Sequence, residues 1–73
     1  MENTPLTILV TYKTLPGKAK AFFEAVTSSG VAAGVRQEPG NRGYNFYLPL
    51  EEEDTLLLVE KWDNKACADA HAH

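Results

Sequence analysis

The sequence lacks the cysteine pairs and metal-binding motifs that cross-link many very small proteins. Among its 73 residues there is one cysteine, Cys67, so no disulfide can form within the chain. It has no CxxC or HxxxH pair of the kind that binds structural zinc, and no metal site is expected. A domain of this length buries too little surface to be comfortably stable alone. Association with a partner is the remaining common solution, so we expect residues 1–73 to form one domain of an oligomer.

Basic charge and long apolar runs are also scarce. The formal net charge is −3, whereas a protein that binds a nucleic-acid backbone needs a basic stripe. No apolar run approaches the roughly 20 residues of a membrane span, and the opening Met1–Glu2–Asn3 does not resemble a secretion signal. We therefore expect neither nucleic acid nor a membrane as a partner, and a cytoplasmic location.

Three segments show the alternation of apolar and polar residues that is typical of strands. They are rich in β-branched, aromatic and leucine residues and are separated by turn-forming residues. Proline and glycine in Glu38–Asn41 favour a turn before the second strand, and the acidic run Glu51–Asp54 is expected to be a solvated loop. The predicted strands are Leu6–Lys13, Gly43–Leu48 and Thr55–Trp62.

Two segments have helical character. A helix is predicted from Lys18 onward, with Phe22 and Val26 on one face. Glycines at 30 and 34 weaken its continuation by about 1 kcal/mol each, so residues 28–35 are expected to form a frayed or broken helix, or a loop. Asp63 or Asn64 is expected to cap a second helix, which contains the alanine-rich residues 66–70.

The resulting order, β-α-β-β-α, is five-sixths of a ferredoxin-like βαββαβ fold, an α+β class with an antiparallel sheet. The last strand of that fold lies beside the first, so its absence would leave the outer edge of Leu6–Lys13 unpaired. An exposed apolar edge is an aggregation liability. We expect either that the natural protein continues beyond His73 or that a partner chain supplies the pairing.

The third strand predicts that the sheet is covered on both sides. All four residues of Leu56–Val59 are apolar, so both faces of the strand favour burial. Two helices can cover one face, and a second copy of the chain is expected to cover the other. Glu60 and Trp62 alternate with Leu58 and are predicted to line the space between the two sheets. An apolar cavity with a few polar groups is the usual form of a small-molecule site.

Short motifs along the chain resemble the antibiotic biosynthesis monooxygenase domain over Leu6 to His71. The motifs are Pro16-Gly17-Lys18, Glu38-Pro39-Gly40, Tyr44, Glu60-Lys61-Trp62 and Ala70-His71. Two features depart from the family pattern: residues 27–35 are longer and richer in glycine, and the H-x-x-S/T-x-H-F continuation after His71 is cut off. The resemblance implies a dimeric α/β barrel formed by two copies of the chain.

The resemblance also implies cofactor-independent oxidation of a small aromatic quinol or phenol by O2. Such substrates are electron-rich and supply electrons to oxygen once they are deprotonated. The protein then needs a dry pocket, a group that handles a proton, and dipoles that favour the anion. No cofactor is expected.

Five residues are the candidates for this site. His71 is the candidate catalytic group, because histidine titrates near neutral pH. Trp62 and Glu60 are expected to bind the substrate from the third strand, and Asn45 and Tyr47 from the second. Structural alternatives stay open: Trp62 as a core residue, His71 as a partner of the helix dipole, and Glu60 in an ion pair.

Similar folds also serve other functions. Phosphate-binding isomerases of signalling sugars would use Arg36 and Arg42, the two arginines that flank the turn. A barrel that binds a ligand without catalysis is a further alternative. An RNA-recognition motif needs aromatic and basic residues that Thr55–Glu60 lacks. Related haem-degrading barrels often carry an asparagine on the first strand, and Leu6–Lys13 has none.

Overall fold

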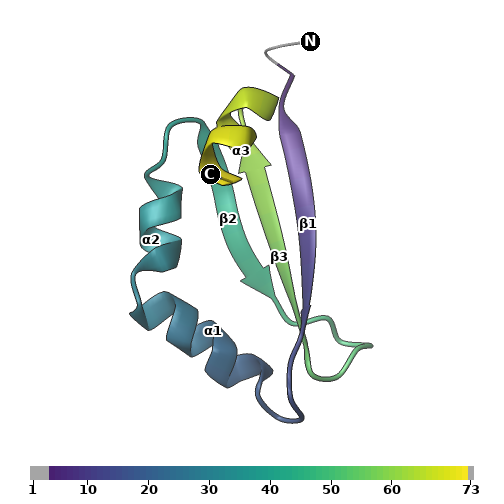
Figure 1. Ribbon diagram of the computed structural model, residues 1–73. Coiled ribbons are helices and arrows are strands. Elements are labelled where there is room, and N and C mark those ends of the chain that lie inside the picture. The colour runs from purple at the N-terminus through teal and green to yellow at the C-terminus, as the bar shows by residue number, and fades with distance from the viewer. Residues whose placement is uncertain (1–3, 73) are drawn as a thin grey trace.

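The computed structural model describes residues 4–72, which form a three-stranded antiparallel sheet and three helices (Figure 1). The elements follow the order β-α-α-β-β-α, and the α+β, ferredoxin-like arrangement predicted from the sequence is confirmed. The elements are β1 (Leu6–Lys13), α1 (Ala19–Ser28), α2 (Val31–Arg36), β2 (Asn41–Tyr47), β3 (Thr55–Trp62) and α3 (Lys65–Ala72).

β3 is the central strand, in the order β1-β3-β2. It pairs with β1 over the full length of both strands, from Leu6 opposite Trp62 to Lys13 opposite Thr55. On its other side Tyr44 of β2 lies opposite Glu60, after an irregularity between Asn41 and Gly43. The bounds of β1 and β3 are as predicted, and β2 begins two residues earlier than predicted, at Asn41.

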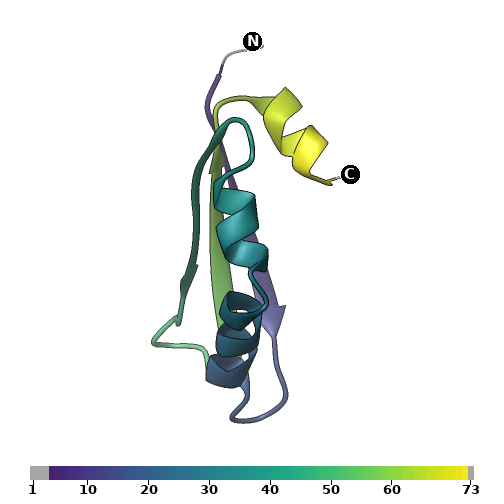
Figure 2. The same cartoon turned by 90° about the vertical axis from the view of Figure 1, so that its left-hand side faces the viewer.

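The predicted break in the first helix is present. α1 ends at Ser28 and α2 begins at Val31, and Gly30 between them has φ = 84°. A positive φ is strained for residues with a Cβ but not for glycine. Of the three outcomes left open by the sequence, a broken helix is therefore the one observed. α1 and α2 lie along the β2 side of the sheet, whereas α3 folds back across the sheet near the end of β3 (Figures 1 and 2).

The helices cover the face of the sheet that carries the even-numbered residues of β3. Leu56, Leu58 and Trp62 on this face are buried, and so is Glu60. The prediction that Glu60 and Trp62 line a space between two sheets is therefore wrong, since they lie under α3. The sequence could not decide this, because Leu56–Val59 is apolar on both faces and only the tertiary contacts show which face the helices take.

The other face of the sheet carries no helix. Leu9 is 65 % exposed there, opposite the partly exposed Val59, and Tyr47 of β2 lies opposite Leu57. Covering of this face by a second copy stays a prediction. No helix within residues 4–72 is long and apolar enough to cross a membrane.

α3 begins on a tightly packed turn. The side-chain oxygen of Asn64 accepts a hydrogen bond from the Cys67 amide at 2.9 Å, so Asn64 is the N-cap, one of the two residues predicted for this role. The Asp63 amide donates to the Gly40 carbonyl at 2.8 Å. Gly40 has φ = 83°, and a Cβ placed on it would lie 2.7 Å from the Cβ of Cys67. The start of α3 and the turn before β2 therefore fit together only with glycine at position 40.

Replacing Gly40 by alanine should lower the free energy of unfolding by about 3–4 kcal/mol, because it combines the cost of a positive φ with overpacking against Cys67. Gly30→Ala is the matched control: its φ of 84° is nearly the same, but nothing lies within 4 Å of the added Cβ. The control should cost about 1–2 kcal/mol. Urea unfolding of both variants measures the difference, which should shrink in a Cys67→Ala background. Equal costs for the two variants would contradict the packing explanation.

Candidate functional site

His71, near the end of α3, lies over the last residue of β3. Its ring stacks on Trp62, with ring centroids 5.0 Å apart and an interplanar angle of 29°. Its Nδ1 lies 2.9 Å from Oε1 of Glu38, and its Nε2 lies 4.0 Å from Oε1 of Glu60. The side chain is 25 % exposed. The imidazole is thus held by the Trp62 ring on one face and by the Glu38 carboxylate at Nδ1. The 4.0 Å between Nε2 and Glu60 is too long for a hydrogen bond.

Trp62 and Glu60 form the floor of this cluster. Trp62 is fully buried, and its indole N–H donates to Oε1 of Glu60 at 3.1 Å. Glu60 is 8 % exposed, so this hydrogen bond offsets part of the cost of burying its carboxylate. Because the two residues are two apart on β3, their side chains share one face of the sheet. Trp62 is therefore both a core residue and the platform on which His71 rests.

Tyr44 lies beside His71 on the same face of the sheet. Its ring meets that of His71 edge to face, with centroids 6.2 Å apart. Nε and Nη2 of Arg36, the last residue of α2, donate to the Tyr44 carbonyl at 3.0 and 2.7 Å. Burial raises the pKa of the Tyr44 phenol above its ordinary value of 10.0, and the nearby Tyr12, Glu60 and Glu38 raise it further, against the opposing charge of Arg36. Tyr44 therefore stays protonated through the neutral range.

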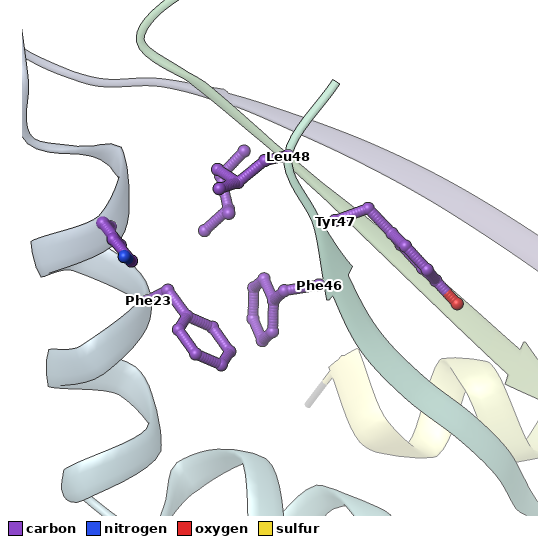
Figure 3. A pocket seen from close by; sticks show the side chains of 6 residues that line it. Phe23, Phe46, Tyr47 and Leu48 are labelled. Atoms are coloured by element: carbon purple, nitrogen blue, oxygen red, sulfur yellow. The ribbon is translucent and has the colours of Figure 1, made fainter. Parts of the chain in front are cut away.

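An open, largely apolar pocket of about 360 Å³ lies between α1 and the end of β2 (Figure 3). Phe23 and Phe46 meet there edge to face, with centroids 5.8 Å apart, and the Tyr47 side chain points away from the pocket. Its lining residues are Lys20, Phe23, Phe46, Tyr47, Leu48 and Leu56.

Phe46 connects this pocket to the His71 cluster. Its ring meets that of Tyr44 edge to face at 5.7 Å, and Tyr44 in turn meets His71. Five rings therefore follow one another across the helix-covered face, in the order Phe23, Phe46, Tyr44, His71 and Trp62. We call these five residues the aromatic row. It has an apolar pocket at one end and a histidine–carboxylate pair near the other.

The structure brings together three of the five residues predicted for the site. Glu60, Trp62 and His71 are in contact, whereas Asn45 and Tyr47 point to the opposite face of the sheet. Glu60 and Trp62 therefore lie on the helix-covered face rather than between two sheets, and substrate binding by Asn45 and Tyr47 stays a prediction. Alternation along β2 correctly placed Asn45 and Tyr47 opposite Tyr44.

Two residues of the cluster were not predicted as site residues. Glu38 was treated as part of a turn, and its contact with His71 joins positions 33 residues apart, which no local pattern indicates. Tyr44 was among the motifs that carry the family resemblance but was given no role in the site. Its pairing opposite Glu60 could have indicated its place, had the register of the two strands been deduced.

The two arginines are the candidates for a phosphate site, and the acidic residues are candidates for a metal site. Arg36 is bound to the Tyr44 carbonyl, and Arg42 pairs with Asp63. Both arginines border a shallow polar hollow of about 310 Å³ beside β2. Within residues 4–72 no three histidine, cysteine, aspartate or glutamate side chains gather in a way that could hold a metal ion.

Comparison with known proteins identifies the family of this chain and related proteins. The family model described as antibiotic biosynthesis monooxygenase matches residues 5–73. An uncharacterised protein from Synechocystis sp. is 30% identical over 69 residues, which cover 94% of this chain and 46% of that protein. The chain thus spans about half the length of this curated relative.

Three crystal structures share the fold. A protein from Shewanella oneidensis superposes with a TM-score of 0.80 at 23% identity, over 96% of this chain and 66% of that one. A protein from Pseudomonas aeruginosa gives 0.75 at 25% identity, over 97% and 70%. A conserved protein from Methanosarcina mazei Go1 gives 0.78 at 22% identity, over 94% and 66%.

The raised pKa of Tyr44 predicts how stability changes in alkali. Above about pH 10 the unfolded chain loses the phenol proton while the folded chain keeps it, so the unfolded state binds fewer protons. The free energy of unfolding should therefore fall as the pH rises above 10. Urea unfolding between pH 8 and 11.5 measures this slope, and Tyr44→Phe should flatten it. A variant with the same alkaline slope as the wild type would rule out Tyr44 as its source.

Proposed function

This chain belongs to the antibiotic biosynthesis monooxygenase family, and we propose that it oxidises a small aromatic quinol or phenol with O2 without a cofactor. The observation that carries the proposal is the aromatic row, which joins an apolar pocket to the His71–Glu38 pair. A ring bound against Phe46 would have to direct its hydroxyl along the row, past Tyr44, to approach the His71–Glu38 pair that would handle its proton.

The pocket suits a flat apolar ring. Its volume of about 360 Å³ is at the small end of the range for small-molecule sites. Phe23 and Phe46 present ring edges and faces to it, and such contacts favour aromatic ligands over aliphatic ones of the same size. The substrate class that fits is therefore an aromatic compound of one or two rings.

His71 would act as the base that removes the hydroxyl proton of the substrate. With its Nδ1–H donating to Glu38, the lone pair of the neutral ring lies on Nε2. The carboxylate then fixes the tautomer and stabilises the imidazolium that forms, and the stack on Trp62 holds the ring in place. The deprotonated substrate supplies electrons to O2: a phenol becomes a quinone, or a quinol a hydroxyquinone, with release of one water.

The alternative of a phosphorylated substrate has less support. A phosphate would be expected to bind cationic side chains directed at the pocket. Arg36 and Arg42 instead contact the Tyr44 carbonyl and Asp63, and they border the hollow beside β2 rather than the apolar pocket. The mainly apolar lining of the Phe23–Phe46 pocket supports the quinol hypothesis over the isomerase hypothesis.

We also propose that the protein is a homodimer, as proteins of this family generally are. The uncovered face of the sheet presents Leu9 beside Val59 and Leu57 beside Tyr47, an apolar strip that sheet-to-sheet packing would remove from water. This face lies opposite the aromatic row, so each protomer would keep its own His71 site.

Oxygen uptake tests the oxidative function. With chelator present and no flavin added, the protein should consume O2 with a naphthoquinol or a phenol at a rate above autoxidation. His71→Ala should lower kcat/KM by about 10²–10⁴-fold, which is the range for the loss of a general base. Asp69→Ala, an exposed change on the same helix, is the control and should have little effect. No uptake by a folded wild type across the panel, or full activity in His71→Ala, would refute the proposal.

The oligomeric state tests the use of the open face. Leu9→Lys should shift a dimer toward monomer in light scattering after size-exclusion chromatography, because it places a charge in the packed strip. Leu15→Lys is the matched control: this leucine is also exposed, at 74 %, but lies beyond the end of β1. A dimer that withstands Leu9→Lys, or one that is lost equally in both variants, would contradict this interface.

A further inference from the structure

The apolar pocket between α1 and the end of β2 carries one positive charge. Of the residues within 4–72 that line it, Lys20 is the one with a charged side chain. The others supply two phenylalanine rings, two leucines and a tyrosine whose side chain points away from the pocket (Figure 3). Leu56 is buried, whereas Lys20 is exposed. The pocket therefore combines an apolar lining with a single ammonium group that reaches water.

The ammonium of Lys20 has no carboxylate partner within residues 4–72. The ion pairs present there involve other cationic side chains. Glu24 lies one turn further along α1, but a lysine that precedes a glutamate by four residues is the weaker order for a helical pair. No ion pair joins these two residues, so the charge of Lys20 is available to a ligand.

The stability of α1 does not explain a lysine at this position. Lys20 is the second residue of the helix, and the backbone N–H groups give this end of a helix a partial positive charge. A cation is unfavourable there, and no acidic residue in the first turn offsets it. The pocket gives this charge a role that the helix does not.

We propose that the pocket binds a small aromatic monocarboxylate, with its ring against Phe23 and Phe46 and its carboxylate paired with the ammonium of Lys20. The proposal rests on the proposed function only in taking this pocket as the substrate site, and it makes the substrate a phenol or quinol whose ring also carries a carboxylate. One ammonium matches one negative charge, whereas a phosphate group favours several convergent donors. Lys20 is thus the residue that selects anionic rings over neutral ones.

A second hollow, of about 390 Å³ beside the start of α1, also carries positive charge, from Lys13 and Lys18. Lys13 is already engaged: its ammonium donates to Oγ1 of Thr55 at 3.0 Å and lies 3.6 Å from Oε2 of Glu52. Lys18, the N-cap residue of α1, does not line the pocket that contains Lys20. Lys18→Met therefore removes the same charge from the same end of the helix without changing that pocket, and it is the matched control.

Binding of two naphthalene derivatives of similar size and opposite charge tests the proposal. The probes are 1-naphthoate and 1-naphthylmethylamine, which is a cation at pH 7. Their dissociation constants are measured by equilibrium dialysis at low salt with the wild type, Lys20→Met, Lys20→Glu and Lys18→Met. Near-ultraviolet circular dichroism first confirms that each variant is folded.

The wild type should bind 1-naphthoate more tightly than the cation, although the chain has a formal net charge of −3. Lys20→Met should raise the Kd of 1-naphthoate about threefold to fivefold, the upper range for an ion pair in contact with water. Salt at 1 M should remove most of this difference, because it screens the charges. Lys20→Glu should reverse the preference, and Lys18→Met should change both constants less than about twofold.

Three results would overturn the proposal. In the first, the wild type binds neither probe, or binds 1-naphthoate no more tightly than the cation. In the second, Lys20→Met and Lys20→Glu leave the preference unchanged. In the third, Lys18→Met weakens 1-naphthoate as much as Lys20→Met does, which would indicate an effect of net charge or binding in the second hollow.

Oxygen uptake separates this proposal from the proposed function. Binding of 1-naphthoate that depends on Lys20, in a wild type that consumes no O2 with the naphthoquinols and phenols, would support the carboxylate site and refute the oxygenase. Uptake by a wild type that shows no preference for the anionic probe would refute the role of Lys20 and support the oxygenase.

Discussion

Backbone pairing on both sides of β3 determines which side chains of the three strands share the helix-covered face. Because β1 and β2 both pair with β3, the alternate side chains of three strands meet on one face at a fixed register. That register places Tyr44 opposite Glu60 and Phe46 opposite Leu58. A slip of β2 by one residue would move Tyr44 and Phe46 to the uncovered face, so the aromatic row exists only in this register.

The position of His71 also depends on α3, which folds back over the end of β3. The hydrogen bond between Asp63 and Gly40 and the Asn64 cap direct the helix across the sheet, so that His71 comes to rest on Trp62. The turn that carries Glu38 takes part in the same packing through Gly40. Three segments distant in the sequence thus meet at one imidazole. The fit between Gly40 and Cys67, one helical turn before His71, helps to set its place.

Local chemistry was enough to predict the elements of this fold. Alternation gave the bounds of Leu6–Lys13 and Thr55–Trp62, and a glycine between apolar helical segments marked the break at Gly30. The face taken by the helices was not predictable, since Leu56–Val59 is apolar on both sides. Motif resemblance identified His71, Trp62 and Glu60, but only tertiary contacts showed that Glu38 and Tyr44 join them, while Asn45 and Tyr47 lie on the opposite face.

The two hydrogen bonds from Arg36 to the Tyr44 carbonyl affect how β2 can pair with other chains. β2 is an outer strand of the sheet, and outer strands are templates for uncontrolled pairing with other chains. Two guanidinium donors already occupy the lone pairs of this carbonyl, so an incoming strand would have to displace both bonds to pair there. Arg36, which holds the backbone at Tyr44, therefore also hinders the pairing of β2 with strands of other chains.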